Sequence, residues 1–195
     1  MKTHYIVTLF ILVVSFPTNA QSDFPQEQKT IDNYTYFEPI YIHQNPNKTD
    51  WLYQRFEELS KITLDSVFDT EKQYYKIREK SDLKLTTEIK NELILIFNSN
   101  SKEQSTLKFT PNLNLISEAI NSRYGIFFLI KTESSITLNT TPISKIRLEV
   151  IILDLIQNEF VFYKKSKNLS PRDYGGYAHT LIKNLNNVYK DIYKL

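Results

Sequence analysis

The segment from Ser170 to His179, SPRDYGGYAH, combines the residue types best suited to bind a ligand. It holds two of the chain's three glycines directly before a stretch with helical periodicity. Free main-chain N–H groups at the start of a helix attract an anion, and an arginine can hold the same anion through two hydrogen bonds. The segment therefore predicts a ligand or partner site made of Arg172, Asp173, Tyr174, Gly175, Gly176 and Tyr177.

The same segment also fits a purely structural entry into a helix. Asp173 favours a helix start, and the glycines allow a tight turn. His179 falls on the polar face of the following helix, which predicts a solvated side chain. The sequence leaves the binding site and the capping loop open as alternatives.

The remaining chemistry-bearing residues form no familiar catalytic or metal motif. His43 and His179 lie far apart, and no HExxH, GxSxG, SxxK, GxGxxG or GxxxxGK[ST] pattern occurs. The chain has no cysteine, which excludes disulfides, thiolate metal sites and a lipid-modified cysteine. Paired carboxylates at Glu57-Glu58 and at Asp65 with Asp69 fit a solvated helix surface. We therefore expect no metal and no cofactor.

The element that positions the binding segment is a hairpin over residues 146–163, IRLEVIILDLIQNEFVFY. Apolar residues first alternate with Arg147 and Glu149, which predicts a strand with one exposed face. The strand then becomes continuously apolar, as in a sheet covered on both faces. Gln157-Asn158 can form the turn because asparagine tolerates positive φ. Asp154 is expected near the turn, where its charge can reach solvent.

Helical periodicity predicts four amphipathic helices. They cover residues 51–63, 82–98, 112–124 and 177–194. Trp51 is expected to anchor the first helix in the core. Gly125 is expected to end the third helix in a left-handed conformation.

Further strands are predicted at 34–43, 105–109 and 126–130, and the first is expected at a sheet edge or broken because Pro39 removes a hydrogen-bond donor. Residues 64–81 are ambiguous, with QYYKI at 73–77 as a short strand or part of a helix. Together the elements predict an α/β (or α+β) fold: a single-layer mixed sheet with the hairpin at its centre, flanked by three or four helices.

The N-terminus has the composition of a secretory signal. Residues 1–20 combine Lys2, an apolar core that is too short for a membrane span, and a small-residue cleavage site. We expect a flexible leader at 21–33 and one domain at 34–195. The sequence predicts an exported bacterial protein, periplasmic or secreted, without a lipid anchor; an uncleaved N-terminal anchor is the alternative.

Charge is nearly balanced, with 24 Lys and Arg against 22 Asp and Glu. This balance gives no electrostatic footprint for nucleic acid or for an anionic membrane. The 13 tyrosines provide large contact area at low conformational cost, as in protein-binding surfaces.

The run from Val150 to Tyr163 resembles the strand–turn–strand of a group of envelope α/β domains, in which an apolar strand ends in Asp and returns with apolar and aromatic residues. The group includes curli-secretion lipoproteins and outer-membrane activators of peptidoglycan synthases. The resemblance covers about residues 112–195 and implies binding or assembly without catalysis. Asn158 stands where the group has Gly, and Tyr163 where Trp is common.

These observations favour a non-catalytic envelope module that binds a protein partner or a cell-wall component. Two alternatives remain. One is a hydrolase with carboxylates near Asp154 or Asp173. The other is a carrier of an apolar ligand, which requires a cavity between sheet and helices.

Overall fold

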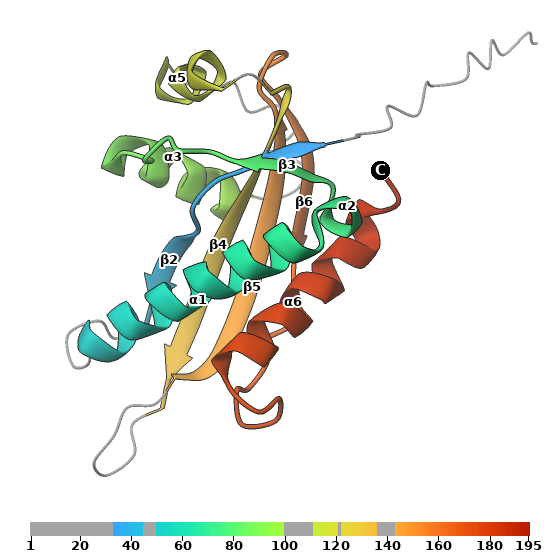
Figure 1. Ribbon diagram of the computed structural model, residues 1–195. Helices are drawn as coiled ribbons and strands as arrows, with labels where there is room; N and C mark the ends of the chain where they lie inside the picture. Colours follow the sequence, from blue (N-terminus) through green and yellow to red (C-terminus); the bar gives the residue numbers. More distant parts are fainter. Residues whose placement is uncertain (1–32, 45–49, 100–110, 121, 136–142) are drawn as a thin grey trace, which may run out of the picture.

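The computed structural model describes residues 33–44, 50–99, 111–120, 122–135 and 143–195 (Figure 1). Six strands and five helices lie within these ranges. In chain order they are β1 Tyr34–Tyr36, β2 Ile40–His43, α1 Asp50–Thr70, α2 Lys72–Tyr75, β3 Ile77–Lys80, α3 Thr87–Asn98, α5 Pro111–Ala119, β4 Tyr124–Ser134, β5 Ile143–Asp154, β6 Glu159–Lys165 and α6 Tyr177–Ile192. The strand predicted at 105–109 lies outside the described residues.

All six strands join one mixed sheet. Its order is β3-β1-β4-β5-β6, and β2 also pairs with β4. The pairings of β1 with β3 and of β1 and β2 with β4 are parallel, whereas β4, β5 and β6 are antiparallel. Pro39 separates β1 from β2, so the strand expected at 34–43 is broken. The α/β prediction with a mixed sheet is confirmed, but the hairpin, which was expected at the centre, lies at one side of the sheet with β6 at the edge.

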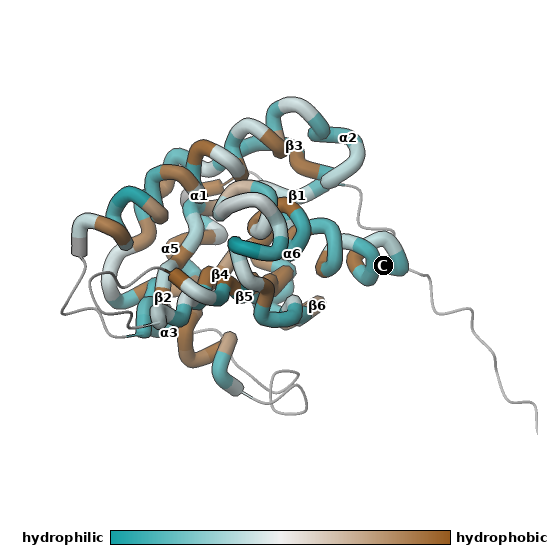
Figure 2. Tube along the Cα trace, turned by 90° about the horizontal axis from the view of Figure 1, so that it is seen from below, coloured by the Kyte–Doolittle hydropathy of each residue, from teal (hydrophilic) through white to brown (hydrophobic). Residues whose placement is uncertain are grey.

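Helices cover both faces of the sheet. One core lies between the sheet and helices α1 and α6, and it includes Phe56, Phe68, Leu181 and Leu185. The second lies on the opposite face against α3 and α5, and it includes Leu93. In the view along the sheet, α1 and α3 lie on opposite sides of β4 and β5 (Figure 2). This three-layer arrangement explains why β5 is apolar on both faces beyond Glu149.

The hairpin predicted over 146–163 is confirmed. Successive residues of β5 alternate between the two cores, with Ile152 in the first and Ile151 in the second. Asn158 adopts φ of 55° in the turn. The last helix packs across β5, where the Asn184 side-chain amide donates to the main-chain oxygen of Ile146 at 3.0 Å. This bond and the apolar face of α6 hold the helix on the hairpin.

Gly125 does not end a helix, and that prediction is wrong. Helix α5 ends at Ala119, and Gly125 lies inside β4, between Thr35 of β1 and Leu153 of β5. A Cβ atom at this position would lie 2.9 Å from Cε2 of Phe127 and 3.0 Å from Cδ1 of Leu155. The glycine is required because these two side chains fill the space that a side chain would occupy.

We expect Gly125→Ala to lower the free energy of unfolding by about 1–2 kcal/mol, because an overpacked core must shift its neighbours. The urea midpoint at an unchanged slope measures the loss. A midpoint equal to that of the parent chain would show that the Phe127 ring moves aside freely.

Several helix boundaries also differ from the prediction. Helix α1 extends to Thr70, and α3 begins at Thr87 after Thr86 caps its N-terminus. Of the two alternatives for 73–77, the helix is present as α2 up to Tyr75, and β3 begins at Ile77. Trp51 is 67% exposed, so it is not a core anchor. The apolar face of α1 is provided instead by residues such as Tyr53 and Phe56, which belong to the first core.

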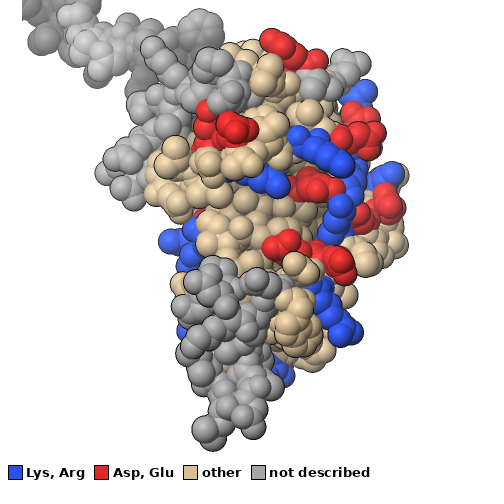
Figure 3. Space-filling model, turned by 90° about the vertical axis from the view of Figure 1, so that its left-hand side faces the viewer, with Lys and Arg blue, Asp and Glu red and all other residues tan. Residues whose placement is uncertain are grey.

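The surface carries mixed charge. On the face drawn in Figure 3, basic and acidic side chains lie interspersed, as the near-balanced composition leads one to expect. Among the described helices, none combines the length and the apolar character needed to cross a membrane.

Candidate functional site

The segment Arg172–Tyr177 lies at the surface and leads into α6, whose first residue is Tyr177. The side chains of Arg172, Asp173 and Tyr174 are exposed. Tyr177 is half-buried, with its ring 5.6 Å from that of Phe56 on α1. The segment is therefore open to a ligand and is anchored at one end, and its role as a binding site stays a prediction.

The two glycines make the sharp entry into α6. Gly175 and Gly176 have φ of 74° and 123°, a region that side chains disfavour. Gly176 is the N-cap residue, and no side chain among the described residues caps the helix. The expectation that Asp173 starts the helix is wrong, because the first turn of α6 contains no acidic residue.

His43 joins β2 to the neighbouring elements. Its Nδ1 lies 2.7 Å from Oγ1 of Thr132 on β4, and its Nε2 lies 2.8 Å from Oε1 of Glu57 on α1. The ring also stacks on Tyr53, with 4.1 Å between centroids. A Thr–His–Glu chain can activate a hydroxyl, but Thr132 is buried and its hydroxyl cannot reach a substrate. We assign these contacts to the packing of α1 on the sheet.

Asp154 is structural. Its Oδ1 accepts the main-chain N–H groups of Ile156 and Gln157 at 3.2 and 3.0 Å, which shapes the β5–β6 turn. Its Oδ2 accepts from Nε and Nη2 of Arg123 at 2.8 and 2.7 Å. The residue is 2% exposed, although the sequence places its charge within reach of solvent. The Asp154 carboxylate is therefore stabilised by the positive charge of Arg123 and not, as expected, by hydration.

The structure reveals a polar hollow that the sequence analysis did not single out. It lies on the sheet face that carries α3, beyond the last turn of that helix, and has a volume of about 620 Å³. We call it the Glu149 basin. Its lining residues are Phe97, Asn98, Ser99, Lys131, Arg147, Glu149, Tyr163, Lys164 and Lys165.

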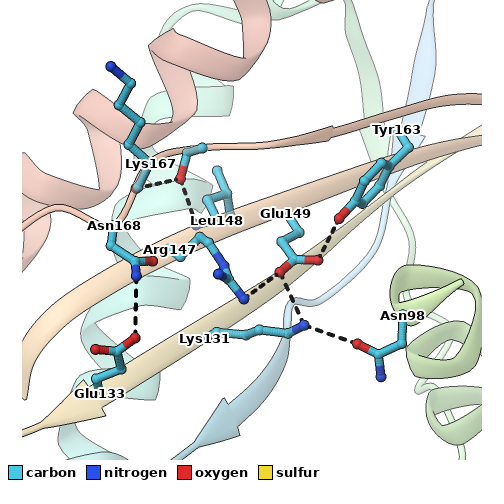
Figure 4. A network of polar contacts seen from close by, with 10 residues as sticks. Asn98, Lys131, Glu133, Arg147, Leu148, Glu149, Tyr163, Lys167 and Asn168 are labelled. Carbon is cyan, nitrogen blue, oxygen red and sulfur yellow. Dashed lines mark hydrogen bonds and ion pairs between the residues drawn. The ribbon is translucent and has the colours of Figure 1, made fainter. Parts of the chain in front are cut away.

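Strand register brings the charges of the basin together. Lys131 on β4 is opposite Arg147 on β5, and Glu149 on β5 is opposite Lys165 on β6. Like charges directly opposite on a sheet repel. The Glu149 carboxylate relieves this repulsion because its Oε1 lies 3.1 Å from Lys131 Nζ and 3.0 Å from Arg147 Nη2 (Figure 4).

A tyrosine and an asparagine complete the network. Tyr163 donates its hydroxyl to Oε2 of Glu149 at 3.0 Å, and Lys131 donates to Asn98 Oδ1 at 3.1 Å, at the end of α3 (Figure 4). Burial, with the nearby Glu149 charge, raises the pKa of Tyr163 to about 12. The phenol therefore stays a hydrogen-bond donor throughout the physiological pH range.

The basin keeps an excess of positive charge. Lys131, Arg147 and Lys165 face the single carboxylate of Glu149, while Lys164 is paired with Asp191 of α6 at 2.6 Å on the other face. Within the part of the chain that the structure describes, two positive charges therefore remain uncompensated at the hollow. Glu149 is 2% exposed, so an incoming group meets the cations rather than the carboxylate. This arrangement suits a ligand with carboxylate or phosphate groups.

No protein-family model matches the chain, and no curated protein matches it significantly. Solved structures show distant likeness. The PelC dodecamer from Paraburkholderia phytofirmans is 9% identical over 79% of this chain and 86% of PelC, with a TM-score of 0.36. The hypothetical protein CT253 from Chlamydia trachomatis is 12% identical over 81% and 96%, with a TM-score of 0.41. Lipoprotein GNA1162 from Neisseria meningitidis is 5% identical over 83% and 99%, with a TM-score of 0.39.

Sequence reasoning missed the basin for an identifiable reason. The sequence pattern predicts Arg147 and Glu149 on the exposed face of a strand, although they stand next to the most apolar part of the chain. Two opposite charges spaced by two residues share one strand face and signal an ionic network. The register of the strands, which the sequence does not reveal, brings Lys131 into this network and places Lys165 opposite Glu149.

Proposed function

We propose that the protein is an exported, non-catalytic module of a bacterial envelope, and that it binds an acidic group of a protein partner or a cell-wall component in the Glu149 basin. The signal-like composition of residues 1–20 supports export. One observation supports the binding role: a buried carboxylate fixes Lys131 and Arg147 at an open hollow that keeps excess positive charge.

Preorganisation is what makes this arrangement favourable for binding. A flexible surface lysine or arginine loses side-chain freedom when it grips a ligand, which weakens the complex. Lys131 and Arg147 are already held by Glu149, and Lys131 is held a second time by Asn98. An acidic ligand therefore gains charge-assisted hydrogen bonds at a reduced entropic cost.

The two alternatives find less support in the same geometry. Both oxygens of Asp154 are engaged by Arg123 and by the turn, so this carboxylate is not free to act in hydrolysis. The Glu149 basin and a second hollow of about 330 Å³ near Tyr41 are lined by charged side chains. Such linings suit polar ligands better than an apolar cargo.

Citrate tests the anion chemistry alone, since it carries carboxylates but no main chain. In an amide NMR titration at low salt, we expect the largest shift changes around Lys131, Arg147 and Lys165. Lys165→Glu should weaken citrate binding at least tenfold, because it reverses one of the cations at the hollow. The same reversal at Lys183, on the exposed face of α6, is the control and should leave the affinity unchanged.

Equal citrate affinity in the parent chain and in Lys165→Glu would contradict the proposal. So would shift changes that cluster at Arg172–Tyr177, which would assign the anion to the loop before α6 instead.

A further inference from the structure

Strand β6 forms one edge of the sheet beside the Glu149 basin. It pairs with β5 on one side, and within the described ranges no strand pairs with its other side. An edge strand presents main-chain N–H and C=O groups that can pair with an added strand. The question is which strand this edge would accept.

The direction of the free groups follows from one hydrogen bond. The N–H of Ser166, which follows β6, donates to the Leu148 oxygen on β5 at 2.8 Å. Main-chain groups alternate in direction along an antiparallel strand. The N–H and C=O groups of Tyr163 and Lys165 therefore point away from β5, toward the free edge.

The side chains of these same two residues belong to the basin. Tyr163 donates to Glu149, and Lys165 is opposite Glu149 in the register. A strand added along this part of β6 would place alternate side chains on the same face, next to Lys165 and the hollow. Main-chain pairing and anion binding thus converge on Tyr163 and Lys165.

Two features restrict which strand can pair. The ladder between β5 and β6 is irregular between Ile152 and Leu153, so the half of β6 that follows its turn is distorted. Irregular pairing and edge lysines both discourage indiscriminate strand addition. The regular half of the edge, Phe162–Lys165, ends in lysine, and a basic strand would be repelled there. An acidic strand would instead be attracted, because its carboxylates can pair with Lys165 across the strands.

We propose that the partner is an acidic polypeptide segment that adds to β6 in an extended conformation, with main-chain hydrogen bonds to Tyr163 and Lys165 and with a carboxylate in the Glu149 basin. This inference rests on the proposed function and narrows its ligand to a protein segment. It predicts that affinity depends on the main chain of the ligand as well as on its charge.

The probe is a fluorescent eight-residue peptide of alternating threonine and glutamate, measured by fluorescence anisotropy at low salt. Its comparison peptide has the same side chains but a methyl group on every main-chain nitrogen, which removes all main-chain donors. We expect the methylated peptide to bind at least tenfold more weakly. In amide exchange, the unmodified peptide should slow the exchange of the Tyr163 and Lys165 N–H groups.

A pair of variants tests the protein side. Lys165→Pro removes both the charge and the N–H at the free edge, and the ladder to β5 does not use this N–H. Lys165→Ala removes the charge alone. Lys165→Pro should weaken peptide binding at least threefold more than Lys165→Ala, whereas the two variants should bind citrate alike. Since the peptide comparison uses the parent chain, it holds even where the proline variant fails to fold.

The outcomes separate the two proposals. Equal binding of the two peptides would overturn strand addition, while citrate binding would still support the basin. Absence of both peptide and citrate binding would overturn the proposed function itself. Protection of the Tyr163 and Lys165 N–H groups in a dimer without peptide would assign the edge to a second copy of the chain, and would overturn the acidic segment.

Discussion

Glu149→Ala is expected to lower the free energy of unfolding by about 3 kcal/mol, because removing one member of a buried ion pair leaves its partners uncompensated. The truncation leaves Lys131 and Arg147 opposite one another on neighbouring strands without a counter-charge. It also removes the acceptor of the Tyr163 hydroxyl. For a chain of this length, we expect the melting temperature to fall by about 6–12 °C.

Two further variants serve as comparisons for the loss of stability in Glu149→Ala. Glu149→Gln keeps the shape and one acceptor oxygen, so its loss should be smaller than that of Glu149→Ala. Lys145→Ala breaks an exposed pair with Glu133 at 3.1 Å and should change the stability by less than about 0.5 kcal/mol. If Glu149→Ala were no more harmful than Lys145→Ala, the network would contribute nothing to the fold.

The same variant should change an alkaline titration. Since the Glu149 charge helps to raise the pKa of Tyr163 to about 12, Glu149→Ala should lower that pKa. Because the folded-state pKa of Tyr163 is raised, its contribution to stability is fully present below the unfolded value of 10 and is lost as the pH rises toward 12. Tyrosinate absorbance during a pH titration measures the shift.

Asp154→Ala is expected to lower the free energy of unfolding by about 2–3 kcal/mol, because it removes a charged acceptor that two main-chain N–H groups and Arg123 share. The main-chain N–H groups of Ile156 and Gln157 lose their shared partner, and Arg123 loses its ion pair. The urea midpoint measures the loss.

Asp154→Asn separates the two contributions. Its side-chain oxygen can still accept from the turn, while the charge that Arg123 requires is gone. We expect a loss of about 1 kcal/mol, since Arg123 is partly exposed and can be hydrated. Equal losses for the asparagine and alanine variants would show that the turn does not depend on the carboxylate.

The hairpin could be predicted because its signals are local. Alternation and apolar runs act within one strand, and the residue at the turn, Asn158, has a side chain that tolerates the required φ. The prediction for Gly125 was wrong because the need for glycine there arises from tertiary contacts and not from local sequence. A glycine after a helical stretch suggests a helix end, but the requirement comes from the rings and methyl groups of Phe127 and Leu155, which only the folded sheet brings near.

Of the two candidate sites, one depends on local sequence and the other on tertiary packing. The loop Arg172–Tyr177 could be located from composition, and the structure leaves it open at the surface before α6. The Glu149 basin could not be located, because strand pairing and the end of α3 at Asn98 together create it. Tertiary packing decides which helix lies over a strand face and at which residue that helix ends.

The parallel pairing of β1 and β2 with β4 has a consequence for the order of folding. These pairings join the N-terminal strands β1, β2 and β3 to the antiparallel strands β4, β5 and β6. The hairpin closes a short loop, whereas Tyr36 has to find Ile126, far along the chain. Closing the longer loop costs more entropy and is slower. We therefore expect the pairings of β1 and β2 with β4 to form late in folding. They join the N-terminal part to the antiparallel strands after each has partly formed.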